Sequence, residues 1–384
     1  MIGSLFPARA FPPSAFAARE RPQPANGYDV IVIGGGALAS ALARACAGNG
    51  AAVAMLAPGA IEPTPAERAW PVVRAAHPDA GRIAIQADAP QRLAKLARWL
   101  TPSPMAERAG CLTLGLDEDR VRTLGTESGH AKAHGVEAWM VPAREVAALA
   151  PPLGRGRGLA PAQHEAGAMV VEADCLTLGL ARAAEEAGAA IFPGARVDAL
   201  ARDGQAVIGV ELGGRFVRAG AVALADDASA IRLVREGRGR LSLRREERTA
   251  LTTGAGAPEL GAAVIAGDLT LARCATGAAT LSGPCGADAI ATRAIALAPE
   301  LAALEVAFEQ PVTLWTGVDG RAQIGPADID GLWLALGFGR DALSPVFAAA
   351  EHLAAALGGG RDDPDFAPFA PTRRAAPRLA EIAS

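Results

Sequence analysis

Residues 28–56, YDVIVIGGGALASALARACAGNGAAVAML, decide the fold of this chain. The run from Val30 to Ile33 is short, continuous and apolar, as in a strand that is buried on both faces. Three glycines follow it, and then an alanine-rich helical segment over residues 37–47. A second apolar run covers residues 52–56. The order of strand, glycine turn, helix and strand is typical of the first unit of a dinucleotide-binding fold.

The glycine turn supplies the candidate phosphate-binding residues. Gly34 allows a tight turn, and Gly36 lets the backbone approach a pyrophosphate closely. The helix that begins at Ala37 would point free N–H groups and its positive dipole end at that anion. Ala39 stands in place of the usual third glycine, which is a tolerated variant. The predicted cofactor-binding residues of this turn are Gly34, Gly35, Gly36, Ala37, Leu38 and Ala39.

One element of the pattern is missing after the second strand. An acidic residue that binds a ribose hydroxyl is expected there, but Leu56 is followed by Ala57, Pro58 and Gly59. The nearest carboxylate, Glu62, comes several residues late. The lack of an acidic residue directly after the second strand weighs against an NAD-linked enzyme as much as against a flavoprotein.

Composition narrows the class of protein. The 384 residues suffice for one large domain or two interleaved ones. A net charge of −4 with 20% charged residues gives no basic field for nucleic acid, and no apolar run approaches the length of a membrane span. Five cysteines without paired spacing indicate reduced thiols and predict a cytoplasmic protein.

The first 27 residues lack the apolar core of a signal peptide. They are rich in proline, alanine and phenylalanine. Two interpretations stay open: a disordered leading segment, or an extended arm that packs on a partner subunit. The second would bury Phe6, Phe11 and Phe16, which are costly to leave in water.

Farther along, periodicity predicts a mixture of helices and strands. Helices are expected over residues 118–134, 142–150, 172–194 and 344–357, and near 286–305. Strands are expected over 110–116, 195–202, 206–212, 216–225 and 331–336, with Asp203 and Gly204 as a hairpin turn. A Gly/Arg loop occupies residues 154–158.

This order of elements resembles the D-amino-acid oxidase superfamily, and most closely its sarcosine oxidase, glycine oxidase and sarcosine oxidase β-subunit branches. The glycine turn carries the resemblance locally. The helix and hairpin over 172–210, the segment GVDGRAQIGPADIDGLWLALGFG at 317–339 and the tail DPDFAPFAPTR at 363–373 are also similar to the family.

The resemblance implies an α/β fold, with a discontinuous Rossmann-type FAD-binding domain of the glutathione-reductase kind. An inserted α+β substrate domain with an antiparallel sheet would complete it. The expected FAD-binding segments are 28–96, 158–230 and 318–360, and the expected substrate segments are 97–157 and 231–317. Residues 1–27 and 361–384 would be an arm and a tail.

The resemblance also implies a reaction. The family uses FAD to oxidise a C–N bond of an amino acid or N-alkyl amino acid to an imine, here with non-covalent FAD. In RAWPVVRAAH at 68–77, Arg74 matches the arginine that holds the substrate carboxylate, a task suited to its planar fork. Arg340 would place a charge at the flavin, and Val197 and Gly339 are carried over as cofactor-binding residues.

Several matching positions depart from the family. The arginine that lies against the flavin falls on Pro71, and the histidine of the same loop falls on Glu67. The turn after the third strand, which passes close to the cofactor, carries Asp226 and Asp227, whose charges would repel a pyrophosphate. The glycine-rich entry to the last helix reads Gly339, Arg340, Asp341 and Ala342, and the carboxylate-binding lysine falls on Ser344.

Two functions follow from these observations. The first is an FAD-dependent oxidoreductase, or a subunit of one, that acts on a small amino-acid-like substrate. The second is a degenerate member that has lost FAD and catalysis, and that serves as a structural or regulatory subunit of an oxidoreductase complex. Either function is compatible with partner subunits. We expect no binding of nucleic acid and no membrane span.

Overall fold

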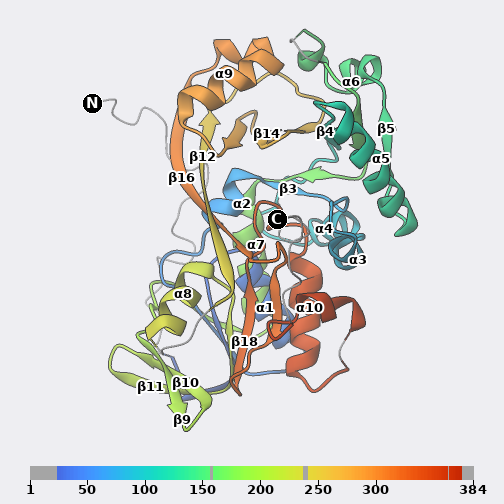
Figure 1. The fold of residues 1–384 in the computed structure, drawn as a ribbon. Coiled ribbons are helices and arrows are strands. Elements are labelled where there is room, and N and C mark those ends of the chain that lie inside the picture. Colours follow the sequence, from blue (N-terminus) through green and yellow to red (C-terminus); the bar gives the residue numbers. More distant parts are fainter. Residues whose placement is uncertain (1–23, 156–158, 237–240, 362, 374–384) are drawn as a thin grey trace.

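The computed structural model describes residues 24–155, 159–236, 241–361 and 363–373. Most of the arm, part of the Gly/Arg loop and the end of the tail therefore lie outside the described residues. Two large sheets organise the rest, one at each end of the molecule (Figure 1).

The first sheet contains the predicted Rossmann unit at its centre. Its strand order is β17-β18-β11-β1-β2-β8, and β9 and β10 extend it through β11. β1 pairs in parallel with both β2 and β11, and β11 pairs in parallel with β18. The strands are β1 (Gly27–Ile33), β2 (Val53–Leu56), β8 (Ala190–Phe192), β9 (Ala199–Asp203), β10 (Ala206–Leu212), β11 (Arg215–Leu224), β17 (Gln323–Pro326) and β18 (Leu332–Leu336).

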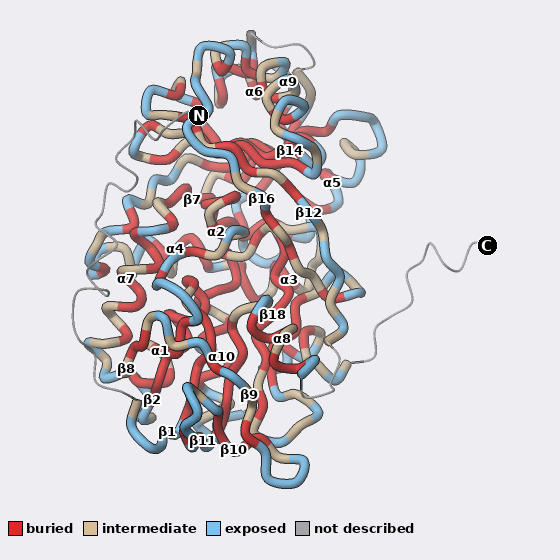
Figure 2. The backbone as a smooth tube through the Cα atoms, turned by 90° about the vertical axis from the view of Figure 1, so that its left-hand side faces the viewer, coloured by how far each residue is buried: buried red, intermediate tan, exposed pale blue. Residues whose placement is uncertain are grey.

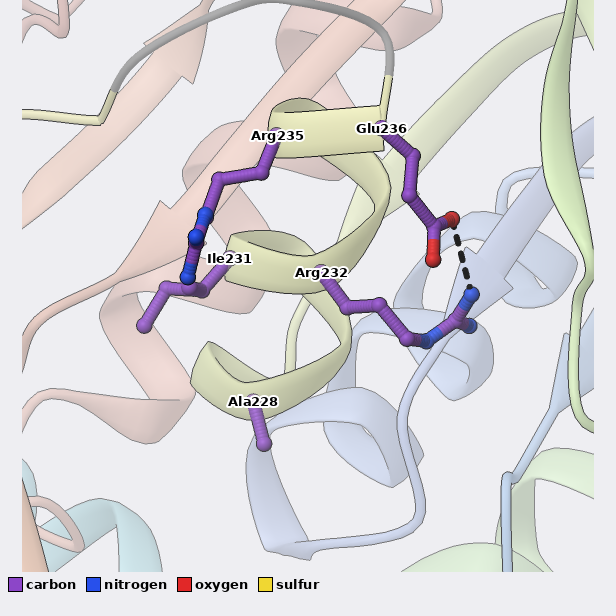
Figure 3. Close-up of a pocket in the computed structure, with 5 residues that line it drawn as sticks. All are labelled: Ala228, Ile231, Arg232, Arg235 and Glu236. Atoms are coloured by element: carbon purple, nitrogen blue, oxygen red, sulfur yellow. Dashed lines mark hydrogen bonds and ion pairs between the residues drawn. The ribbon is translucent and has the colours of Figure 1, made fainter.

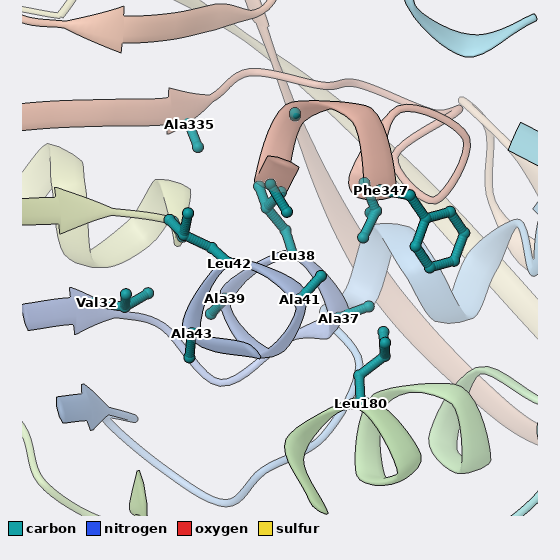
Figure 4. Close-up of a cluster of buried hydrophobic side chains, with 14 of the residues drawn as sticks. Val32, Ala37, Leu38, Ala39, Ala41, Leu42, Ala43, Leu180, Ala335 and Phe347 are labelled. Atoms are coloured by element: carbon teal, nitrogen blue, oxygen red, sulfur yellow. The ribbon is translucent and has the colours of Figure 1, made fainter. Parts of the chain in front are cut away.

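Helices cover both faces of this sheet. α1 (Ala37–Gly48) packs between α7 (Ala173–Glu186) and α10 (Val346–Leu357) on one face (Figure 4). α8 (Asp227–Glu236) buries Ala230, Leu233 and Val234 on the other face. The small side chains of α1 allow this close packing, since Ala37, Ala39 and Ala43 have no exposed surface.

The second sheet has the order β16-β12-β15-β14-β13-β4-β6-β5. It is mostly antiparallel, as expected for the inserted region, with one parallel pair between β4 and β13. Its strands are β4 (Cys111–Leu114), β5 (Ala138–Val141), β6 (Ala162–Glu165), β12 (Leu243–Thr253), β13 (Ala263–Ala266), β14 (Leu269–Arg273), β15 (Ala279–Gly283) and β16 (Val306–Gly317). β12 and β16 reach toward the first sheet (Figure 1).

The remaining elements lie around and between the sheets. Figure 2 shows the buried strands of both sheets under exposed loops. The remaining elements are α2 (Pro65–Ala69), β3 (Val72–Val73), α3 (Ala80–Gln86), α4 (Ala89–Leu96), α5 (Glu118–Ala133), α6 (Ala143–Leu149), η2 (Pro151–Arg155), β7 (Met169–Val170), α9 (Ala287–Leu297), η3 (Pro299–Ala303) and η4 (Pro364–Phe369).

The helix expected within residues 172–194 is confirmed together with its expected C-terminus at Gly188. α7 ends at Glu186, and Gly188 takes a left-handed conformation with φ +105°. Residues 190–192 then form β8, which pairs in parallel with β2. The strand expected from residue 195 begins at Ala199, while the hairpin turn at Asp203 and Gly204 is confirmed.

Candidate functional site

The glycine turn lies where an open parallel sheet binds its ligands, beyond the carboxyl ends of the strands at a switch in strand order. β1 has β2 on one side and β11 on the other. The position expected for a ligand therefore lies just beyond Ile33 and Leu224, where β1 and β11 end. Gly34 has φ +151°, and a Cβ added there would lie 3.0 Å from the carbonyl oxygen of Ala225. The turn therefore requires glycine at this position.

The loop that follows β2 lies directly on this turn. A Cβ on Gly35 would lie 2.8 Å from the carbonyl oxygen of Ala60 and 3.2 Å from the Cβ of Ala57. Glu62 donates its N–H to the carbonyl oxygen of Gly35 over 3.2 Å. Ala57, at the position of the missing acid, has no exposed surface. The chain itself thus covers the place of the ribose-binding residue.

Glu67 occupies the N-terminus of α1. Its Oε2 accepts a hydrogen bond from the N–H of Ala37 at 3.3 Å, and the N–H of Leu38 also contributes to holding the carboxylate. The same Oε2 accepts from the N–H of Thr64 at 2.8 Å, in a capping box at the start of α2. A single buried carboxylate therefore caps α1 and α2 together.

Further negative groups lie near Glu67. Asp226 Oδ2 accepts a hydrogen bond from the N–H of Ser229, in the first turn of α8. Asp227 Oδ1 accepts a hydrogen bond from the N–H of Gly337. Burial raises the pKa of Asp227 to about 7, with smaller contributions from the negative charges of Asp226 and Glu67. Burial likewise raises the pKa of Glu67, against the hydrogen bonds that favour its charged form.

These residues do not fit the pyrophosphate of FAD in the position that the resemblance implies. A Cβ on Gly36 would lie 2.9 Å from both Oε2 of Glu67 and Cγ2 of Thr64, so the approach to the backbone is already filled. The two N–H groups at the start of α1 face a carboxylate of the chain. A phosphate placed there would displace Glu67 and meet Asp227 as well.

A second cluster joins the two segments that the resemblance places beside the flavin. Trp70 donates from Nε1 to Oδ1 of Asp341 at 3.0 Å, and Arg74 donates its backbone N–H to Oγ of Ser344 at 3.0 Å. Arg82 donates from Nη1 to the carbonyl oxygen of Phe338 at 2.9 Å. The segments are thus in direct contact.

The cluster combines buried positive and negative groups. Arg74, Arg82 and Arg340 are its guanidinium groups. Asp341 and Glu165 are its carboxylates, and the charges of Glu127 and Asp79 also act on Arg74 and Arg82. The pKa of Asp341 lies well below its usual range because the attraction of Arg340 and Arg74 outweighs the effect of burial. Glu165 accepts two hydrogen bonds, from the N–H groups of residues 75 and 76.

Two of these arginines keep unused donors. Among the described residues, Nε of Arg74 and Nε of Arg340 are buried without a hydrogen-bond acceptor. Arg74 Nε lies 3.5 Å from Glu165 Oε2, and Arg340 Nη2 lies 3.9 Å from Asp341 Oδ2. Buried guanidinium donors without an acceptor suit a bound carboxylate.

The structure therefore brings Arg74 and Arg340 to the same charged cluster, while the predicted phosphate-binding residues surround Glu67. Gly339 has φ +66° and donates its N–H to the carbonyl oxygen of Trp315. Val197 belongs to the buried apolar cluster that includes Ile33 and Leu224, and its carbonyl oxygen accepts from Nη2 of Arg232 at 2.5 Å.

A cavity of about 480 Å³ opens beside α8 (Figure 3). An ion pair of 3.1 Å joins Arg232 and Glu236 at its edge. Its described lining consists of Ala228, Ile231, Arg232, Arg235 and Glu236, all from one helix. None of the predicted site residues lines it.

Trp70, Arg82 and Glu165 were not predicted as members of the site, and Glu67 was noted only as a departure from the family. Only Glu67 left a local signal. Thr64 followed by Glu67, with proline at the first helical position, is the pattern of a capping box. Nothing in the sequence near Trp70 or Arg82 indicates their contacts with residues 338–341.

Within the described ranges, no helix is long and apolar enough to cross a membrane. The same ranges contain no group of three or more histidine, cysteine, aspartate or glutamate side chains that could hold a metal ion. All five cysteines are free.

The chain is similar in fold to several solved structures. Glycine oxidase from Geobacillus kaustophilus is 21% identical with a TM-score of 0.82, over 92% of this chain and 100% of that one. L-proline dehydrogenase from P. horikoshii is 18% identical with a TM-score of 0.82, over 91% and 98%. L-amino acid deaminase from Proteus vulgaris is 15% identical with a TM-score of 0.83, over 95% and 98%.

A comparison with curated protein sequences finds no significant match. The profile of the family described as "DAO: FAD dependent oxidoreductase" matches residues 29–356, which is most of the chain and includes both sheets. The chain therefore belongs to the DAO family of FAD-dependent oxidoreductases.

Proposed function

We propose that this chain is a non-catalytic member of the DAO family, a structural or regulatory subunit of an oxidoreductase complex that no longer binds FAD. One observation carries the proposal: the carboxylate of Glu67 caps α1 at the position where the family would bind a pyrophosphate. A negative side chain in that place competes directly with a negative cofactor.

Burial along the rest of the predicted cofactor path supports the proposal. Side chains that line an empty cavity keep accessible surface, whereas Ser344 has none and Trp70 is 1% exposed. The contact of Trp70 with Asp341 fills space beside the predicted flavin position. Both sheets and their cores remain complete, so the fold is kept while the site is filled.

The surface of the protein exposes large apolar side chains that a partner subunit could cover. Trp99 is 82% exposed, and Phe308 and Leu116 are each more than half exposed. Large exposed aromatic side chains are frequent anchors of protein interfaces. We expect the protein to remain colourless and to associate with a flavin-bearing partner.

The test is the visible absorbance spectrum of the purified full-length chain, before and after denaturation and after incubation with excess FAD. The proposal predicts no flavin bands and no uptake of added FAD, with co-purifying chains identified on the same sample. Flavin bands that are released on denaturation would refute it.

A second candidate, FAD-dependent oxidation of an amino-acid-like C–N bond, is favoured by the unused donors of Arg74 and Arg340. The printed names of the structural neighbours, which act on glycine, L-proline or L-amino acids, agree with a carboxylate ligand. Glu67 would then have to leave the start of α1 when FAD binds.

The Arg74→Ala variant tests this candidate if the protein does contain FAD. Loss of one desolvated carboxylate contact should weaken substrate binding by about 2–5 kcal/mol. KM would rise strongly while the bound flavin spectrum stays unchanged. An unchanged KM would remove Arg74 from the substrate site.

A further inference from the structure

We propose that Glu67 is an internal substitute for a cofactor phosphate, and that it completes the nucleotide-binding turn of this chain in the absence of a nucleotide. The inference rests on the proposed function and explains how the turn stays stable without its ligand. It assigns to Glu67 a role that neither the capping box nor the family pattern supplies.

The start of α1 needs a negative partner. The first N–H groups of a helix have no acceptor within the helix, and the helix dipole adds partial positive charge. α1 has no side-chain cap of its own, since its N-cap is Gly36, and it has no acidic residue in its first turn. The acceptor is supplied by Glu67, which lies 30 positions from Ala37 in the sequence.

The carboxylate is held in place as a bound anion would be. Its Oε2 accepts from the N–H of Ala37 at 3.3 Å and from the N–H of Thr64 at 2.8 Å, and the side chain is 2% exposed. Glu67 also lies close to the open side of Gly36, 2.9 Å from where a Cβ would stand. One side chain thus supplies an acidic group, hydrogen-bond acceptors and bulk at this turn.

The arrangement differs from an ordinary capping box. In a capping box, the glutamate at the third helical position reaches back only to its own N-cap residue. Here the same carboxylate also accepts from Ala37 and Leu38 of a different helix. Removal of Glu67 should therefore uncover N–H groups of α1 that an external anion can bind.

The experiment is chemical rescue of the Glu67→Ala variant by inorganic phosphate. We compare Tm in tens of millimolar phosphate with Tm in chloride at matched ionic strength. Removal of the side chain should lower Tm in chloride, and phosphate should raise it again by about 2–4 °C. The wild-type Tm should not respond to the exchange of anion, because its site is filled.

Two control variants separate this effect from general salt stabilisation. Glu67→Gln keeps the volume but loses the charge, so its Tm should fall without rescue by phosphate. Glu62→Ala removes a half-exposed carboxylate of the same loop that pairs with Arg68, and its Tm should not depend on the anion.

A Tm of Glu67→Ala that phosphate raises no more than it raises the wild-type value would overturn the inference. If Glu67→Ala does not fold in chloride, the yield of folded protein on refolding in phosphate replaces Tm, and equal yields in both anions would overturn it. These outcomes are independent of the flavin spectrum of the wild-type chain, which alone decides the proposed function.

Discussion

Trp70 and Asp341, which are 271 residues apart in the sequence, are joined by a hydrogen bond of 3.0 Å from Nε1 to Oδ1. Both side chains are buried, with exposed fractions of 1% and 5%. The bond connects the loop before β3 to the entry of α10. It closes the space between the two segments that the family resemblance places beside a flavin.

We expect Trp70→Phe to destabilise the protein. The substitution removes the indole donor and leaves a buried carboxylate with one hydrogen bond fewer, at a cost of about 1–3 kcal/mol. Denaturant unfolding measures the change. Trp99→Phe is the matched control, because Trp99 is 82% exposed, and its free energy of unfolding should be unchanged. Equal values for both variants would contradict the role of the Trp70 bond.

Asp341→Asn should be more costly than Trp70→Phe. Asp341 pairs with Arg340 at 3.9 Å, and its loss removes the carboxylate whose charge acts on Arg74, Arg82 and Arg340 alike. Uncompensated buried charge costs about 3–5 kcal/mol. Asp203→Asn, in the exposed hairpin turn, is the control. A loss of stability no larger than in that control would show that the guanidinium groups do not depend on Asp341.

The lowered pKa of Asp341 predicts that the folded protein loses stability in acid. The pKa of Asp341 is lower in the folded protein than the usual 3.8, so the folded state binds fewer protons than the unfolded state. Its stabilising contribution is complete above pH 4 and is lost as the pH falls further. Acid unfolding followed by circular dichroism should therefore be shallower for Asp341→Asn than for the wild type between pH 4 and pH 2.

The raised pKa of Asp227 predicts that the free energy of unfolding depends on pH with the opposite sign. Burial raises its pKa from 3.8 to about 7, so the folded state binds more protons than the unfolded state between these values. The free energy of unfolding should therefore decrease as the pH rises from 4 to 7. Because one pKa unit corresponds to about 1.4 kcal/mol, the full effect is on the order of 4 kcal/mol.

The variant Asp227→Asn tests this dependence. Asparagine keeps an oxygen for the N–H of Gly337 but does not ionise. We expect its stability to vary less between pH 4 and pH 7 than that of the wild type, and to exceed it at pH 8. Parallel curves for the two proteins would assign the dependence to another group.

Gly36→Ala tests the space beside Glu67. Gly36 has φ −82°, which alanine adopts readily, so any cost comes from the contacts of the added Cβ. Those contacts are Oε2 of Glu67 and Cγ2 of Thr64, each at 2.9 Å. We expect destabilisation of about 1–3 kcal/mol, as for other overpacked sites.

A double-mutant cycle identifies the contact. In the Glu67→Ala background the same substitution should cost less, with a coupling energy of about 0.5–3 kcal/mol. Gly48→Ala is the control, because a Cβ there meets nothing within 4 Å. Strictly additive effects of Gly36→Ala and Glu67→Ala would show that Glu67 does not fill the space at Gly36.

Local sequence determined much of the fold. The run from Val30 to Ile33, the three glycines and the alanine-rich segment predicted β1, the turn and α1 in the order that the structure shows. The hairpin of β9 and β10, the strand β18 and the helix α10 were also predicted correctly, because each has its period and its end signals within one short window. The end of α7 at Gly188 was also predicted correctly, whereas the short strand β8 that follows it was not predicted.

The state of the site was decided by tertiary structure. The sequence indicated that Glu67, Asp227, Asp341 and Ser344 stand where the family has other residues, but it gave no sign of their partners. Glu67 meets Ala37, and Trp70 meets Asp341, only because the sheet brings the ends of β1 and β18 to one edge. Side-chain periodicity records which face of an element is buried, whereas a hydrogen bond between segments hundreds of residues apart depends on the completed packing.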